Sequence, residues 1–340
     1  MRRHLPISMV AVLLAALMVV SQVAVAVAQD ASPAAGGARF ADTLDLPELQ
    51  ITGTDTGFEG LPEETEAGRY LVTLTNEAEQ GSAVEFLQLP EGKTADDLMA
   101  AFAAAAPPGP DATPGPGMAE GSPMAGMDES SPVTEEDPLG WIYEAYIAGG
   151  VGTFFPGQTA QVIVDLEPGD YAVWGAEPEA PQQPVELTVT GEMPADLPEP
   201  SADVTVTATG TNEGYDLEFS GEVAPGQQTL QFVNDSDQPH FLLFLKSPGP
   251  ITLDQVMQLL QLPEGAAPPP GMPNPEEIMP AAFAATISED AAEWVALDLE
   301  PGYYIVACFI PDRENPQMPH AAEGLIDVIA VGVDEATPTS

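Results

Sequence analysis

The sequence predicts an all-β protein made of two β-sandwich domains in tandem. Three observations support this class. The chain of 340 residues has room for about two domains. Short runs rich in β-branched and aromatic residues alternate with Pro/Gly turns, as in sandwiches. The whole pattern of runs and turns also occurs twice along the chain, so that each copy accounts for one sandwich.

The first part of the repeat consists of a strand, a polar turn opened by asparagine, a second strand and the start of a helix. It reads "YLVTLTNEAEQGSAVEFLQLPEGKTADDLMAAF" in the first copy and "LQFVNDSDQPHFLLFLKSPGPITLDQVMQLL" in the second. Aligning Asn76 with Asn234 also aligns Thr94 with Thr252 without a gap. Each threonine is followed three residues later by an acidic or amide side chain, which is a capping-box arrangement. Each copy is thus expected to carry one short inserted helix.

The second part of the repeat consists of three further strands. The segment "AQVIVDLEPGDYAVWGAEPEAP" matches "AEWVALDLEPGYYIVACFIPDRENP", with the shared "DLEPG" at Asp165 and Asp298. Pro-Gly between two β-rich runs predicts a turn between two strands. A last strand closes each copy, "PVELTVTG" in the first and "GLIDVIAVG" in the second.

Composition sets the expected boundaries. A flexible leader spans 29–40, the first domain 41–191, a proline-rich acidic linker 192–202, the second domain 203–333 and a polar tail 334–340. Two segments inside the domains lack apolar periodicity and are expected to be irregular loops: Pro107–Asp137 and Pro263–Pro280.

The N-terminus has the parts of a secretory signal peptide. Arg2 and Arg3 precede an apolar run that ends at Ala28, and "AVA" at its end is a small-x-small cleavage site. We expect residues 1–28 to be removed; an uncleaved anchor is the alternative, since the run is just long enough to span a bilayer. No other segment has this length and apolarity. The mature protein is therefore expected to be soluble and secreted, periplasmic or displayed at the cell surface.

The charge balance restricts the partners. Fifty-four acidic residues face seven basic ones, for a formal net charge of −47. Nucleic acids and anionic membrane surfaces require cationic patches, so neither is expected as a partner. The charge favours solubility, a cationic partner, or high-salt or acidic surroundings.

Three side chains of the mature chain are candidate metal ligands: His240, Cys308 and His320. His4 leaves with the signal peptide, and Cys308 is the only cysteine, so it cannot form an internal disulfide. His240 begins the strand "HFLLFL", Cys308 ends "YYIVAC", and His320 lies on the loop to the last strand. These positions can converge at one end of a sandwich, and a thiolate with two imidazoles suits copper. The alternatives are a buried structural thiol and a cysteine that pairs with a partner chain.

The pattern N-x5-H … C-x11-H-x4-L, at Asn234, His240, Cys308, His320 and Leu325, resembles the cupredoxin (blue, type 1 copper) family. It is similar to the blue-copper domains of copper nitrite reductases and to uncharacterised exported bacterial cupredoxin-like proteins. The resemblance covers the second domain well and the first more weakly. It implies two Greek-key sandwiches, one type 1-like copper ion and single-electron exchange with an unknown redox partner protein.

The resemblance also implies a role for each residue. His240 is the first imidazole ligand, Cys308 the thiolate and covalent electron path, and His320 the second imidazole and exposed edge of the site. Leu325 stands where the family usually has an axial methionine. Because leucine cannot ligate, the centre would be three-coordinate with a raised reduction potential. Met318 is the alternative axial ligand.

Two departures from the family's pattern bear on the site. Phe241 follows His240 where many blue copper proteins have an asparagine that braces the site, so part of the shell around the ligands is expected to be missing. The first copy has Ser82 opposite His240 and Gly175 opposite Cys308, and it contains no histidine. It is expected to keep the scaffold without a metal, which makes the ligands dispensable for folding.

We do not expect an enzyme. Two-domain cupredoxins that are enzymes need further copper ions held by several more histidines, and no nucleophile motif is present. Two other functions stay open. One is a metal-free extracellular interaction module. The other is copper storage or trafficking, since thioether sulfurs bind Cu(I) and the first irregular loop carries Met118, Met124 and Met127.

Overall fold

The computed structural model describes residues 45–105, 138–175, 183–262 and 267–334. The expected signal peptide and leader, the three methionines of the first irregular loop and nearly all of the polar tail lie outside these residues. The expectations for them stay predictions. Within the described part of the chain, no helix is both long and apolar enough to cross a membrane.

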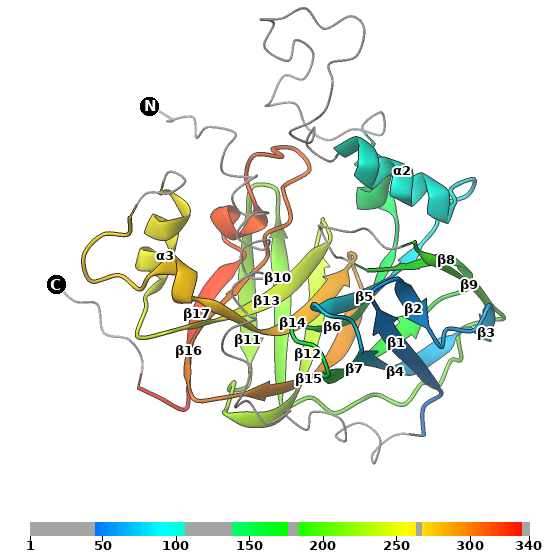
Figure 1. Ribbon diagram of the computed structural model, residues 1–340, viewed down its shortest axis with the longest axis horizontal. Coiled ribbons are helices and arrows are strands. Elements are labelled where there is room, and N and C mark those ends of the chain that lie inside the picture. Colours follow the sequence, from blue (N-terminus) through cyan, green and yellow to red (C-terminus); the bar gives the residue numbers. More distant parts are fainter. Residues whose placement is uncertain (1–44, 106–137, 176–182, 263–266, 335–340) are drawn as a thin grey trace, which may run out of the picture.

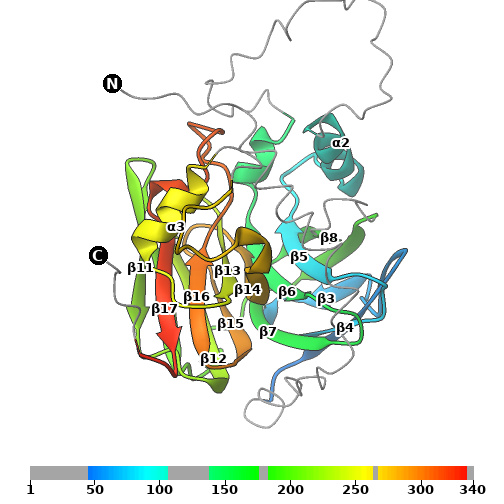
Figure 2. The same cartoon turned by 60° about the vertical axis from the view of Figure 1, so that its left-hand side comes forward.

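The described strands form two sheets that pack face to face, which confirms the expected all-β sandwich architecture (Figure 1; Figure 2). The eight-stranded sheet has the order β11-β10-β12-β15-β7-β4-β1-β2, and the nine-stranded sheet the order β17-β16-β13-β14-β6-β5-β8-β9-β3. The strands of the first are β1 (Glu48–Thr54), β2 (Gly57–Glu59), β4 (Gly68–Asn76), β7 (Thr159–Leu166), β10 (Val204–Thr211), β11 (Gly214–Ser220), β12 (Gly226–Ser236) and β15 (Ala292–Leu299). Those of the second are β3 (Glu64–Glu66), β5 (Ser82–Gln88), β6 (Ile147–Thr153), β8 (Gly169–Trp174), β9 (Val185–Thr190), β13 (His240–Ser247), β14 (Met279–Ile287), β16 (Gly302–Ala307) and β17 (Ile326–Val331).

Each sheet runs through both copies of the repeat, which the sequence did not predict. We call residues 41–191 the first half and 203–333 the second half. β7 pairs antiparallel with β15, and Val162 lies opposite Val295; these two valines occupy equivalent positions, each three residues before the aspartate of "DLEPG". β6 pairs antiparallel with β14 in the other sheet. The halves therefore meet edge to edge in both sheets and contribute to one apolar core cluster.

The buried asparagines confirm the alignment of the two copies. Asn76 and Asn234 have no exposed surface. The amide nitrogen of Asn234 donates to the carbonyl oxygens of Gln238 at 2.8 Å and Ile287 at 3.0 Å, and its oxygen accepts from the backbone N–H of Ser236 at 3.0 Å. Asn76 makes the three corresponding bonds in the first half. Each asparagine thus fixes the turn between two strands.

Both expected helices are present, α2 (Ala95–Ala105) and α3 (Leu253–Leu260). Thr252 accepts from the backbone N–H of Gln255, and the Gln255 side chain accepts from the backbone N–H of Thr252, which confirms the capping box. Thr94 makes the same reciprocal pair with the residue three positions later. Each helix covers an apolar patch on the nine-stranded sheet of its own half (Figure 1).

The strands that join the halves in the nine-stranded sheet were not predicted. β6, "IAGGVGT", contains three glycines and β14, "MPAAFAATI", four alanines, and both residue types are depleted in strands. The irregular loop expected over Pro263–Pro280 is correspondingly shorter. It contains a short 3-10 helix, η4 (Pro275–Glu277), and ends where β14 begins at Met279.

Two carboxyl groups are buried where the halves meet. Glu85 of the first half accepts from the backbone N–H and the hydroxyl of Thr286, at 3.1 and 2.8 Å. Glu293 of the second half accepts from the backbone N–H of Gly150 at 3.0 Å, and burial raises the pKa of both carboxyls. Gly149 has a φ of +103°, and a Cβ there would collide with the Glu293 carboxyl. Gly149 of β6 thus leaves room for this side chain.

Candidate metal centre

The fold places the three predicted ligands at one end of the nine-stranded sheet. His240 is the first residue of β13, directly after the turn held by the buried asparagine. Cys308 immediately follows β16, and His320 begins the 3-10 helix η5 (His320–Glu323) that leads to β17. Because β13 and β16 are antiparallel neighbours, the start of one lies beside the end of the other.

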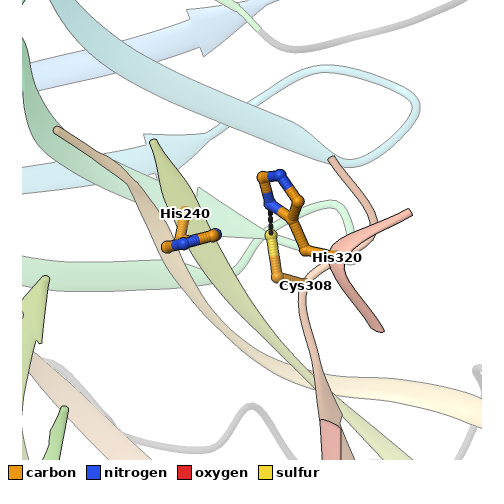
Figure 3. A group of neighbouring side chains, drawn as sticks. All are labelled: His240, Cys308 and His320. Carbon is orange, nitrogen blue, oxygen red and sulfur yellow. Dashed lines mark hydrogen bonds between the residues drawn. The ribbon is translucent and has the colours of Figure 1, made fainter. Parts of the chain in front are cut away.

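The three side chains converge (Figure 3). One ring nitrogen from each histidine and the sulfur of Cys308 lie within 4.8 Å of one another. Nδ1 of His320 is 3.7 Å from Cys308 Sγ, and the ring centroids of His240 and His320 are 4.4 Å apart. None of the three has any exposed surface. Across the described ranges, this is the one group of three or more His, Cys, Asp or Glu side chains arranged to hold a metal ion.

Of the three candidate ligands, His240 is the one whose ring nitrogens have no hydrogen-bond partner among the described residues. Its side chain is nevertheless fully buried. Such an unpaired buried group costs about 1–3 kcal/mol. Burial, with a smaller contribution from His320, lowers the pKa of His240 well below its usual value, so the ring is neutral. A neutral imidazole with a free lone pair is what a metal ligand requires, so the residues fit a bound metal.

A second side chain fixes the orientation of His320. Its Nε2 lies 3.3 Å from Oε1 of Gln238, which also accepts from the backbone N–H of Arg313 at 2.9 Å. Because that oxygen can only accept, the proton of His320 resides on Nε2, and the Nδ1 lone pair faces Cys308. Nε2 of Gln238 donates to the buried Asp312 at 2.6 Å. Burial lowers the pKa of His320 to about 4, so this ring is neutral too.

The expectation that His320 forms the exposed edge of the site is wrong. The side chain has no exposed surface, because Gln238 and Asp312 occupy the outer side of its ring. These two residues and their contacts were missed from the sequence. No spacing in the motif links them to the ligands, although Gln238 lies only two residues before His240.

The sulfur of Cys308 lies in an apolar pocket with two backbone donors. Burial raises the pKa of the Cys308 thiol to about 12, and backbone N–H groups of Ile310 and Phe241 act in the opposite direction. Without a metal the thiol is therefore protonated. The Phe241 side chain lacks the polar group of the asparagine it replaces, but its backbone amide contributes one of these two sulfur contacts.

The axial position is apolar. Leu325 has no exposed surface and packs in the same core cluster as Cys308. Its backbone N–H donates to the carbonyl of His320 at 2.9 Å, and its carbonyl accepts from the N–H of Cys308 at 3.1 Å. Met318 is half-buried on the loop between the ligands, and its role as an axial ligand stays a prediction.

Tyr215 of β11 forms a wall of the site. Its ring centroid lies 4.9 Å from that of His240 and 4.8 Å from that of His320. Its hydroxyl lies 3.3 Å from a carboxylate oxygen of Asp237. This contact could not be predicted from the sequence, because β11 belongs to the opposite sheet and no motif connects it with the ligands.

The equivalent place in the first half is closed by an aromatic ring. A Cβ at Gly175, the counterpart of Cys308, would lie 2.9 Å from the ring of Phe58 and 3.2 Å from the carbonyl oxygen of Ala83. Ser82, the counterpart of the first histidine, is buried there. Phe58 thus occupies space that a ligand side chain would need.

Comparisons with known proteins found similar solved structures of copper proteins. No protein-family model and no curated protein matches the chain. Similar solved structures include a reduced auracyanin from Roseiflexus castenholzii, with 20% identity, 38% of this chain and 95% of that chain covered, and a TM-score of 0.24. A copper nitrite reductase from Nitrosomonas europaea is 13% identical, with 84% and 94% covered and a TM-score of 0.22.

A third similar structure, a multicopper oxidase, is 12% identical, with 84% of this chain and 88% of that chain covered and a TM-score of 0.21. At these identities and TM-scores the likenesses carry no weight for the function. The reasoning on the site rests on its donor set, a thiol and two neutral imidazoles, which is compatible with type 1 copper.

Proposed function

We propose that this chain is an exported cupredoxin-like protein that binds one copper ion in a type 1-like site and transfers single electrons. One observation carries the proposal: His240 is fully buried, neither of its ring nitrogens has a hydrogen-bond partner among the described residues, and it lies beside the sulfur of Cys308 and a ring nitrogen of His320. A bound ion is the partner that this arrangement lacks. The large negative charge of the chain favours a basic redox partner protein.

The donor set favours copper over zinc. Structural zinc sites are almost always closed by four ligands, and catalytic zinc keeps water in the fourth position. Here the group has three donors, and the buried Leu325 lies beside Cys308 in the core. A thiolate with two imidazoles is the set that copper uses for electron transfer. Bound copper would contribute a one-electron couple between Cu(I) and Cu(II).

The residues of the chain would hold this couple in fixed geometry. Cys308 would lose its proton on binding, and the two backbone N–H groups that face its sulfur would stabilise the thiolate. Gln238 would hold His320 with Nδ1 toward the ion. The full burial of these side chains would keep water out, and Leu325 at the axial position, which supplies no donor atom, would raise the reduction potential.

A titration followed by visible spectroscopy tests the proposal. Cu(II) added to the metal-free chain should produce an intense thiolate-to-copper band that saturates at one equivalent. The band should vanish in Cys308→Ser, whereas Ser82→Ala in the first half should leave it unchanged. A colourless protein without stoichiometric copper would contradict the proposal and favour the metal-free interaction module. The full burial and raised pKa of Cys308, as in a structural thiol, favour that second candidate.

Two further outcomes separate electron transfer from the other functions. Oxygen consumption or nitrite reduction by the copper-loaded chain would contradict a role without substrate turnover. Copper storage requires extra Cu(I) bound by Met118, Met124 and Met127. Deleting residues 107–137 should leave the Cu(I) stoichiometry at one, and a drop from a higher value would support storage.

A further inference from the structure

We propose that residues 139–147 of the first half brace the metal centre of the second half, and that Tyr143 is a positioning residue for its ligand loop. This role rests on the proposed function, whereas the contacts themselves do not depend on a bound metal. They suggest a role for the first half, whose described residues contain no group arranged to hold a metal ion.

The first contact joins the brace to the loop between Cys308 and His320. The hydroxyl of Tyr143, in the 3-10 helix η3 (Gly140–Glu144), donates to the carbonyl oxygen of Pro311 at 3.0 Å. Next to it, Glu144 forms an ion pair with Arg313 of the same loop. Both contacts cross from one half of the molecule to the other.

Residues of the same loop connect this contact to His320 through Gln238. Pro311 and Arg313 flank Asp312, whose carboxylate accepts from the amide nitrogen of Gln238 at 2.6 Å. The backbone N–H of Arg313 donates to the amide oxygen of Gln238 at 2.9 Å, and the same oxygen faces Nε2 of His320 at 3.3 Å. Tyr143 and the ring of His320 are thus joined through these polar contacts and the backbone from Pro311 to Arg313.

The second contact joins the brace to the strand opposite the first ligand. The backbone N–H of Ile147 donates to the hydroxyl of Ser288 at 2.9 Å, and that hydroxyl donates to the carbonyl of Ala145 at 3.1 Å. The N–H of Ser288 donates back to the carbonyl of Ile147 at 3.0 Å. Ser288 directly follows Ile287, which pairs with His240. One short segment therefore holds both ligand-bearing parts of the second half.

Such a brace matters for electron transfer. A site that changes oxidation state without rearranging needs its ligands fixed in advance, which calls for support beyond the ligands themselves. Eleven residues separate Cys308 from His320, and long loops are mobile unless held. The contacts of the first half fall on this loop and beside His240, the places where support is needed.

The rate at which Cys308 reacts with a small disulfide reagent tests the brace in the metal-free chain. Because the thiol has no exposed surface, the reaction reports opening of the site. Tyr143→Phe removes one hydrogen bond and should raise the rate about fivefold. Glu144→Gln removes a partly exposed ion pair and should raise it about twofold. The charge exchange Glu144→Arg with Arg313→Glu should bring the rate back toward that of the wild type.

A matched control separates bracing from general stability. Tyr171→Phe removes a tyrosine-to-carbonyl hydrogen bond of the same kind, to Glu167 at 3.0 Å, inside the first half. It should leave the labelling rate unchanged. In the copper-loaded chain, Tyr143→Phe should shift or broaden the thiolate-to-copper band, and Tyr171→Phe should not. An unchanged rate in Tyr143→Phe, or an equal rise in Tyr171→Phe, would overturn the brace. A wild-type chain that binds no copper would instead overturn the proposed function, because the labelling needs no metal.

Discussion

The two halves of the molecule share a buried asparagine, a capped helix and a closing strand, but they differ at one end of the sheet. In the first half, Ser82 and Gly175 stand at the ligand positions and Phe58 fills the space. In the second half, His240 and Cys308 stand there, and neither ring nitrogen of His240 has a hydrogen-bond partner among the described residues. The first half keeps the same strands, turn and helix without these side chains. The difference favours the proposed role of these side chains in binding over a role in folding.

Replacing His240 should have the largest effect, because it should change copper binding and the stability of the metal-free chain in opposite directions. His240→Leu should abolish the copper band and should also stabilise the metal-free chain by about 1–2 kcal/mol, because an unpaired buried polar group is removed. Denaturant unfolding of the metal-free chain measures this. His320→Leu should also lose copper without the gain in stability, since it leaves Gln238 with one contact fewer. A clear loss of stability in His240→Leu would show that the imidazole is structural.

The buried asparagines Asn76 and Asn234 occupy equivalent positions, so replacing each one compares the two halves directly. Asn76→Ala removes three hydrogen bonds and Asn234→Ala removes four, each from a fully buried side chain, so each should lower the free energy of unfolding by about 3 kcal/mol. Since the halves share their sheets, one unfolding transition is expected in both variants. Copper should dissociate faster only from Asn234→Ala, which loosens the residues beside His240. Two separate transitions would show that the halves unfold independently.

The buried carboxyls predict how the contact between halves depends on pH. The pKa values of Glu85 and Glu293 are raised above the usual 4.5, so the folded chain keeps protons that the unfolded chain releases. Their contribution to stability is fully present below about pH 4.5 and is lost as the pH rises through the raised values. Glu85→Gln with Glu293→Gln keeps an accepting oxygen but has no such proton. Urea unfolding at several pH values should show a flatter profile for this variant, and an unchanged profile would contradict the assignment.

The helix caps give the smallest expected effect. Thr252→Ala should lower the free energy of unfolding by about 1 kcal/mol through loss of the capping box. Thr94→Ala should act in the same direction in the first half. Neither change touches a ligand, so the copper band should stay as it is. Thermal unfolding measures the loss, and a change of the band in Thr252→Ala would show that α3 also supports the site.

Much of the fold and the site could be predicted because the repeat aligns one half with the other. Asn76 and Asn234 fix the register, so the places of His240 and Cys308 at strand ends follow from local pattern. The convergence of Cys308 with His320 also followed, because both lie on one loop. These predictions depend on contacts between segments whose order and spacing are visible in the sequence.

The features of the fold and the site that could not be predicted depend on contacts between segments far apart in the sequence. β6 was missed because its three glycines weaken its strand pattern; Gly149 makes room for Glu293, and Gly150 and Gly152 lie close to neighbouring strands. The exposure predicted for His320 was wrong because Gln238, from a distant turn, faces its ring. Tyr215 and Tyr143 approach the centre from the opposite sheet and from the other half. Local periodicity in the sequence does not predict contacts between segments this far apart.

The pairing of Val162 with Val295 has a consequence for any attempt to isolate the second half. Equivalent residues meet across an approximate twofold axis, as they do in a symmetric homodimer. The chain is thus organised as a fused dimer, and cutting it at the linker would leave two open strand edges on each fragment. The isolated fragment that carries the ligands would be driven to associate with a second copy of itself, with two metal centres and no brace from the other half.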